Sequence, residues 1–236
     1  MRKIAIFVEG LTEMLFVDRL IQELAEESGL AVEHAQGIGG AVRARQIKVL
    51  KRTTIQPHHR YYVLIVNCAG DSNVKSDIIE RYHGLKQSGY SAIIGLRDVY
   101  EQFRYEDVAR LRGALEVGMP KTDDLPVELL LAIMEIEAWF LGEYTHFERV
   151  SPNLKLDRIK RTLQFDPSAD DLEKRAHPAE DLDRIYQLAG LRYTKQRNNL
   201  ERTIELLDFR FFISNVSRRF PDAGRLIVAL GNQLSG

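Results

Sequence analysis

Three short apolar runs constrain the fold of this chain more than any other feature. They are KIAIFV at 3–8, YYVLIVN at 61–67 and SAIIGL at 91–96. A strand that helices cover on both faces is apolar almost throughout, whereas a strand with one solvent-exposed face alternates apolar and polar residues. The runs therefore predict strands of a mostly parallel sheet that is buried on both faces.

Helical spacing separates these runs. After the first run, Phe16, Leu20 and Leu24 recur every four residues, and after the second a comparable apolar face extends from Val74 to Leu85. Such spacing is typical of one face of an α-helix. Strand and helix signals alternate in this way over 1–143, which predicts an α/β fold with a doubly wound, mostly parallel sheet flanked by helices.

The segment between the first two runs is less regular. Residues 31–36 are interpreted as a short strand that Gly37, Gly39 and Gly40 interrupt, and residues 41–53 as a basic helix. The glycines do not form a Walker loop, because the Gly-Lys-Ser/Thr ending is absent. Their amides could still hold a phosphate, which keeps a nucleotide-binding function open.

The second half of the chain differs in composition from the first. Prolines punctuate polar and charged segments after about residue 150, and strand signals disappear. The ranges 179–189, 198–209 and 222–231 have helical patterns. We therefore expect a core domain over 1–150 and a helical annex over 151–236 that packs on it.

Composition narrows the class of protein. The chain has 236 residues, of which 44% are hydrophobic and 28% charged, as in an ordinary soluble protein. Its single cysteine, Cys68, excludes an internal disulfide and any multi-cysteine metal site. The first residues lack the features of a signal peptide, and no apolar run is long enough to span a bilayer. We expect a cytoplasmic protein that does not contact membranes.

Acidic side chains follow the ends of the predicted strands. They are Glu9 and Glu13, Asp71, Asp98, and Glu135 with Glu137. Ligands of open α/β sheets bind beyond the carboxyl ends of the strands. Carboxylates gathered there repel one another, and a bound cation removes that penalty. Hard oxygen ligands without histidine or cysteine suit Mg²⁺ or Mn²⁺, so the sequence predicts such a site.

Several of these acids also have structural interpretations. Glu13 in the first turn of a helix would interact favourably with the helix dipole, and Asp98 after a strand could be a cap or turn residue. Glu9 is harder to explain structurally, because it directly follows a strand that should be central and buried. Glu135 and Glu137 would share a face in an extended segment and would diverge on a helix.

Two of these motifs resemble a known family. VEGLTE at Val8–Glu13 resembles the first motif of Toprim domains, which occur in topoisomerases, primases and overcoming-lysogenization-defect nucleases. The second Toprim motif is Asp-x-Asp after a later strand, and Asp98-Val99-Tyr100 stands in its place. The chain is most similar to a bacterial family, domain of unknown function 4276, which looks like a Toprim relative.

The likeness to that family covers nearly the whole chain. It includes an acid-x-acid-Ala segment at Glu135–Ala138, a Tyr-x-Lys at Tyr193–Lys195, and an aromatic-Pro helix start at Phe220–Pro221. The departure is Tyr100, which replaces the second aspartate and is a poor anionic ligand near neutral pH. Either Glu135 or Glu137 then supplies the missing carboxylate, or the site is degenerate.

Basic residues offer candidate contacts to nucleic acid. The formal net charge is −1, so such contacts must come from local patches. The basic segment contains Arg43, Arg45, Lys48, Lys51 and Arg52. It could contact phosphates or simply form a solvated face. Lys195 could neutralise a scissile phosphate. We assign no chemistry to His58 and His59.

The resemblance implies a Toprim-like, metal-dependent nuclease that cuts DNA or RNA and works beside an ATPase partner in bacterial antiphage defence. Glu9 and Asp98 would bind Mg²⁺ or Mn²⁺, Glu13 would hold the ion or act as general base, and Lys195 would be catalytic. Glu135 or Glu137 would complete the cluster. The alternative is a non-catalytic binding or regulatory subunit of an ATPase complex with a degenerate site.

Overall fold

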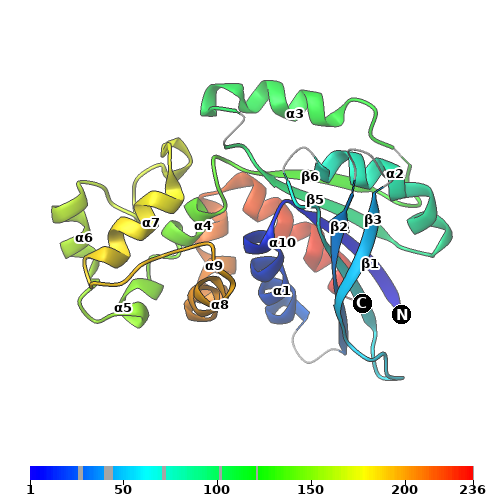
Figure 1. The fold of residues 1–236 in the computed structure, drawn as a ribbon, viewed down its shortest axis with the longest axis horizontal. Helices are drawn as coiled ribbons and strands as arrows, with labels where there is room; N and C mark the ends of the chain where they lie inside the picture. Colours follow the sequence, from blue (N-terminus) through cyan, green and yellow to red (C-terminus); the bar gives the residue numbers. More distant parts are fainter. Residues whose placement is uncertain (26–28, 40–44, 71–72, 101–102, 121, 236) are drawn as a thin grey trace. The chain divides into compact units, whose positions relative to one another are not determined.

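A six-stranded sheet organises the computed structural model of this chain (Figure 1). Its strand order is β3-β2-β4-β1-β5-β6. The strands are β1 (Arg2–Val8), β2 (Leu30–Ile38), β3 (Gln46–Arg52), β4 (Tyr61–Asn67), β5 (Ala92–Asp98) and β6 (Val127–Ala132). The β1–β4, β1–β5 and β2–β4 pairs are parallel, and β2–β3 is antiparallel. The predicted α/β class with a mostly parallel sheet is confirmed.

The structure describes residues 1–25, 29–39, 45–70, 73–100, 103–120 and 122–235. Two compact units are present. Unit 1 comprises Met1–Arg97, Arg110–Leu131 and Val228–Gly236, and unit 2 comprises Asp98–Ala109 and Ala132–Ile227. The two units alternate along the chain, whereas the sequence predicts one division near residue 150.

The helices fall into two sets. The helices between strands of the sheet are α1 (Leu11–Ala25), α2 (Asn73–Gln87) and α3 (Val108–Glu116). The later helices are α4 (Glu137–Gly142), α5 (His146–Val150), α6 (Leu156–Leu163), α7 (Pro178–Gln187), α8 (Arg197–Leu206), α9 (Phe209–Ser214) and α10 (Pro221–Leu234). Short 3-10 turns lie at Tyr105–Asp107, Leu172–Lys174 and Val216–Arg218. The three helices predicted after residue 150 correspond to α7, α8 and α10.

Helices cover both faces of the sheet because the connections run in opposite directions. The β1-α1-β2 connection crosses towards β3, and the β4-α2-β5 connection crosses towards β6. Right-handed crossovers that run in opposite directions place their helices on opposite faces. Figure 1 shows α1 and α2 on the two sides of the strands. The sheet is therefore doubly wound, with a change of winding at β1.

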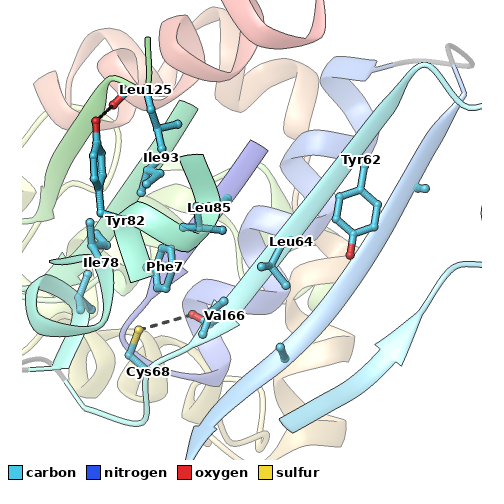
Figure 2. Packing of buried hydrophobic residues seen from close by; sticks show 14 residues of the cluster. Phe7, Tyr62, Leu64, Val66, Cys68, Ile78, Tyr82, Leu85, Ile93 and Leu125 are labelled. Carbon is cyan, nitrogen blue, oxygen red and sulfur yellow. Dashed lines mark hydrogen bonds between the residues drawn. The ribbon is translucent and has the colours of Figure 1, made fainter. Parts of the chain in front are cut away.

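Burial follows from this arrangement. Phe7 of β1 packs in one buried cluster with Leu64 and Val66 of β4 and with Ile78 and Leu85 of α2 (Figure 2). Residues of the opposite parity on β1, such as Ile4 and Ile6, are also fully buried. Both faces of the central strands thus exclude water, which explains why their sequences are apolar at nearly every position.

One predicted element is wrong. The range 41–53, interpreted as a basic helix, contains the strand β3, whose residues pair antiparallel with β2. Residues 40–44, including Arg43, lie outside the described part of the chain. Ile47 of β3 packs against the buried cluster. Pairing with a neighbouring strand and this contact outweigh local helix propensity. The predicted strand at 31–36 is present as the longer β2, which contains Gly37.

Gly95 of β5 lies against the side chains of Leu129 and Ile78. A Cβ atom there would collide with Leu129 and would lie 2.8 Å from Cδ1 of Ile78. We expect Gly95→Ala to destabilise the protein by roughly 1–3 kcal/mol through overpacking, measured by urea unfolding. Gly113→Ala in α3 is the control, because nothing lies within 4 Å of its Cβ position. Gly113→Ala should stabilise the protein by about 0.5–1 kcal/mol. Equal changes in the free energy of unfolding for the two variants would contradict tight packing at Gly95.

Candidate functional site

The turn after β6 has an unusual backbone. Met134 adopts a φ of 63°, in the left-handed region that non-glycine residues rarely occupy. Glu135 follows in the turn, and Glu137 is the first residue of α4. Such a conformation costs free energy and persists only where surrounding contacts enforce it, which is common at functional sites.

Asp98 and its neighbours supply those contacts. The backbone N–H of Tyr100 donates to the carbonyl of Met134 at 2.8 Å. The backbone N–H of Ile136 donates to Oδ1 of Asp98 at 3.1 Å, and Asp98 is buried. The carboxylate predicted to bind metal therefore also orients the turn that presents Glu135 and Glu137.

Glu135 and Glu137 converge on one cation. Nζ of Lys195 lies 3.2 Å from Oε1 of Glu135 and 3.2 Å from Oε1 of Glu137. The sequence left open whether an extended segment would align these acids or a helix would separate them. The structure has a turn followed by a helix start, and both carboxylates still reach Lys195. Three predicted residues thus form one cluster, next to Asp98.

Glu137 is the most constrained member of this cluster. It is fully buried, and its Oε1 accepts a hydrogen bond from the Tyr193 hydroxyl at 2.7 Å. Its Oε2 is buried without a hydrogen-bond partner. Burial raises the pKa of the Glu137 carboxyl; Lys195 opposes this, Glu135 adds to the rise and Tyr193 opposes it. A buried carboxylate with an unsatisfied oxygen has a site for one more positive or donating group.

Glu135 has a second contact that is structural. Its Oε2 accepts a hydrogen bond from the backbone N–H of Ala179 at 2.9 Å. Ala179 is the second residue of α7, where backbone N–H groups lack partners within the helix. Glu135 thereby caps α7 and favours its dipole. Its other oxygen faces Lys195.

The donor set of this cluster fits a hard divalent cation. Asp98, Glu135 and Glu137 offer carboxylate oxygens, and one oxygen of Glu137 is unsatisfied. Among the described residues, however, no three His, Cys, Asp or Glu side chains form a group ready to hold a metal ion. The Lys195 ammonium supplies the positive charge instead. Its side chain is 49% exposed, so it is able to turn away towards solvent.

Glu9 and Glu13 belong to unit 1. Oε2 of Glu13 accepts a hydrogen bond from the backbone N–H of Gly10 at 2.8 Å, as the glutamate of a capping box does at the start of a helix. The structural interpretation of Glu13 therefore has a concrete contact. Glu9 is half-buried at the carboxyl end of β1, and its carbonyl accepts from the Gly70 N–H at 3.0 Å.

Two arginines of the predicted nucleic-acid segment form internal ion pairs. Arg45 binds both oxygens of the fully buried Asp77, at 2.5 and 2.7 Å. Arg52 pairs with buried Glu33, which also accepts from Tyr62. The structure thus assigns both guanidinium groups a role in holding β3 and its neighbours.

The remaining candidates of this segment differ. Lys48 and Lys51 are exposed on β3 and stay candidates for phosphate contacts. Gly37 lies inside β2, where a Cβ atom would lie 2.5 Å from Nη2 of Arg45. The absence of a side chain at Gly37 therefore leaves room for the Arg45 guanidinium. The nucleotide-binding hypothesis had instead assigned this glycine to a phosphate-binding turn. Gly40 and Asp71 lie outside the described residues.

Sequence reasoning missed the role of Tyr193. The Tyr-x-Lys at Tyr193–Lys195 was a sequence signal for this role, because a hydroxyl and an ammonium two residues apart can both contact one carboxylate. Only the fold shows that this acid is Glu137.

No protein-family model, curated protein or solved structure matches this chain. No described helix is both long enough and apolar enough to cross a membrane.

Tyr193→Phe tests the hydrogen bond to Glu137. Because a buried acceptor would lose its donor, we expect a loss of roughly 1–3 kcal/mol in the free energy of unfolding, measured with urea. Tyr186→Phe is the matched control, since its hydroxyl lies 3.5 Å from Oγ1 of Thr203, at the edge of hydrogen bonding. If Tyr186→Phe lost as much free energy of unfolding as Tyr193→Phe, the hydrogen bond to Glu137 would contribute no specific stability.

Proposed function

We propose that this protein is a Toprim-like, metal-dependent nuclease that hydrolyses phosphodiester bonds of DNA or RNA. The convergence of Glu135 and Glu137, with one fully buried and partly unsatisfied carboxylate, carries this proposal. A purely structural role would not require two acids to be gathered in this way, because burial of like charges costs free energy. An acid cluster suits a site that stabilises phosphate chemistry.

In this proposal Asp98, Glu135 and Glu137 hold Mg²⁺ or Mn²⁺. When bound, such an ion neutralises phosphate charge and makes a water molecule more acidic. With an ion bound, the exposed Lys195 side chain would be able to turn from the two carboxylates and pair with the phosphate. Tyr193 keeps Glu137 in position through its hydroxyl.

The proposed role of Glu9 rests on the resemblance of VEGLTE at Val8–Glu13 to the first Toprim motif. We propose that Glu9 joins Asp98 as a metal ligand and that Glu13 orients or deprotonates water.

Tyr100 has a position that agrees with a shifted ligand set. Its ring lies 5.0 Å from the ring of His177 in an edge-on arrangement. Its backbone N–H holds the turn at Met134. The residue that replaces the second Toprim aspartate therefore packs and orients the turn, and we propose that Glu135 and Glu137 provide the missing carboxylates.

A second candidate function is a non-catalytic binding or regulatory subunit of an ATPase complex. One oxygen of Asp98 is already engaged by a backbone donor, and Lys195 already neutralises two acids. These contacts would stabilise a metal-free site. Under either function we propose an ATPase as protein partner, and the nuclease would also bind nucleic acid. The exposed Lys48 and Lys51 are its proposed phosphate contacts. We also propose that the protein acts in the cytoplasm, in antiphage defence.

A cleavage assay separates the two functions. Single- and double-stranded DNA and RNA are incubated with Mg²⁺ or Mn²⁺, with and without a candidate ATPase partner. We expect the wild-type protein to cut, and Glu9→Gln, Asp98→Asn and Glu137→Gln each to lose on the order of 100-fold or more in rate. Glu205→Gln, an exposed change on α8, is the control and should cut normally.

Circular dichroism and thermal unfolding check that each variant is folded. Retained cutting by all three site variants would overturn the assignment of the site. Absence of cutting by the wild-type protein under every condition would favour the binding subunit.

A further inference from the structure

Unit 1 contains a cavity of about 570 Å³, and the proposed nuclease function assigns a role to Lys51 alone among its described lining residues. We call it the His34 cavity. It is lined by residues of α1, the first half of β2, the end of β3 and the turn before β4. The charged and imidazole side chains that line it are Asp18, Arg19, His34, Lys51, His58 and His59.

A buried polar pair forms one side of the His34 cavity. His34 is only 7% exposed, and its Nε2 lies 3.0 Å from Oδ2 of Asp18. Oδ1 of Asp18 accepts a hydrogen bond from Nε2 of Gln22 at 2.8 Å, which fixes the carboxylate on α1. Burying such a pair costs free energy that apolar side chains would avoid. Its position beside a cavity is typical of a binding site.

The opposite wall is built by a close backbone approach. Gly29 has a φ of 76°, and a Cβ atom there would collide with the carbonyl of His58. The backbone N–H of Arg60 donates to the carbonyl of Gly29 at 2.8 Å. Nδ1 of His59 accepts from the N–H of Gln56 at 2.7 Å, so Nε2 of the neutral ring carries the proton. The turn thus fixes His58 and His59 beside the cavity.

The side chains around the cavity favour an anion. Arg19 supplies a guanidinium and Lys51 an ammonium, His58 and His59 supply imidazole groups, and Asp18 is the one acid among the described lining residues. A guanidinium, an ammonium and imidazole N–H groups together match the oxygens of a phosphate. The volume lies in the range of small-molecule sites and exceeds the size of a phosphate alone.

The cavity lies at the opposite end of the sheet from Glu9. Gly29 and Leu30 stand at the amino-terminal end of β2, and His59 lies two residues before the first residue of β4. Glu9 follows the carboxyl end of β1, which runs parallel to β4. We propose that the His34 cavity binds a small molecule through a phosphate group, as a site separate from the acidic cluster.

Titrations of the full chain test this proposal. Inorganic phosphate, AMP and adenosine are added separately, and binding is followed by calorimetry and by the imidazole NMR signals. We expect phosphate and AMP to shift the signals of His34, His58 and His59, with AMP binding more tightly. Adenosine, which lacks the phosphate, should leave them unchanged.

Two lysines on the same strand provide matched variants. Lys51 lines the cavity and is paired with His34 in the sheet register, whereas Lys48 is paired with Gln36 and is not among the lining residues. We expect Lys51→Ala to weaken AMP binding by about tenfold, the loss of one favourable charge pair. Lys48→Ala should bind AMP as the wild-type protein does. Thermal unfolding shows whether both variants are folded.

Four results would overturn the proposal. The first is no response of the wild-type protein to phosphate or AMP up to about 10 mM, a weaker affinity than small-molecule sites have. The second is binding of adenosine as tight as that of AMP. The third is an equal loss of AMP binding in Lys48→Ala and Lys51→Ala. The fourth is that a single-stranded oligonucleotide binds and AMP does not. Either of these two would indicate a general basic surface.

Discussion

The buried carboxylate of Glu137 is the constraint on which the site of unit 2 depends. An ionised acid without water requires compensation from nearby groups. Tyr193 donates one hydrogen bond and Lys195 supplies a charge, both to the same oxygen. The other oxygen has no hydrogen-bond partner. The segment between α7 and α8 is therefore tied to the start of α4 by electrostatics, and the remaining oxygen defines where a further cation would be stabilised.

The backbone around Glu137 is arranged to present it. Met134 occupies a strained conformation, and hydrogen bonds from Tyr100 and to Asp98 hold the turn there. Asp98 ends β5, a strand of the doubly wound sheet. The order of elements thus explains how acids from two distant parts of the sequence meet. It also explains why Asp98 has a structural contact in addition to its proposed chemistry.

The apolar runs at 3–8, 61–67 and 91–96 were sufficient to predict β1, β4 and β5, because strands covered on both faces tolerate few polar residues. The same rule fails for β3, an exposed strand whose basic residues resemble a solvated helix face. Glu13 and Arg45 were predicted as functional, and the fold adds a structural contact for each, with Gly10 and Asp77. Tyr193 and the His34 cavity depend on contacts between residues far apart in sequence. No local pattern encodes such contacts, so only the fold reveals them.

The central claim is that the carboxylates around Glu137 take a divalent cation in place of the Lys195 ammonium. The most direct measurement is anomalous X-ray diffraction from crystals of the wild-type protein soaked in Mn²⁺. We predict an anomalous peak in contact with the Glu137 carboxylate, with Lys195 turned away from Glu135. The claim would be contradicted if crystals soaked in Mn²⁺ showed no anomalous peak at Glu137 and Lys195 still lay between the two glutamates.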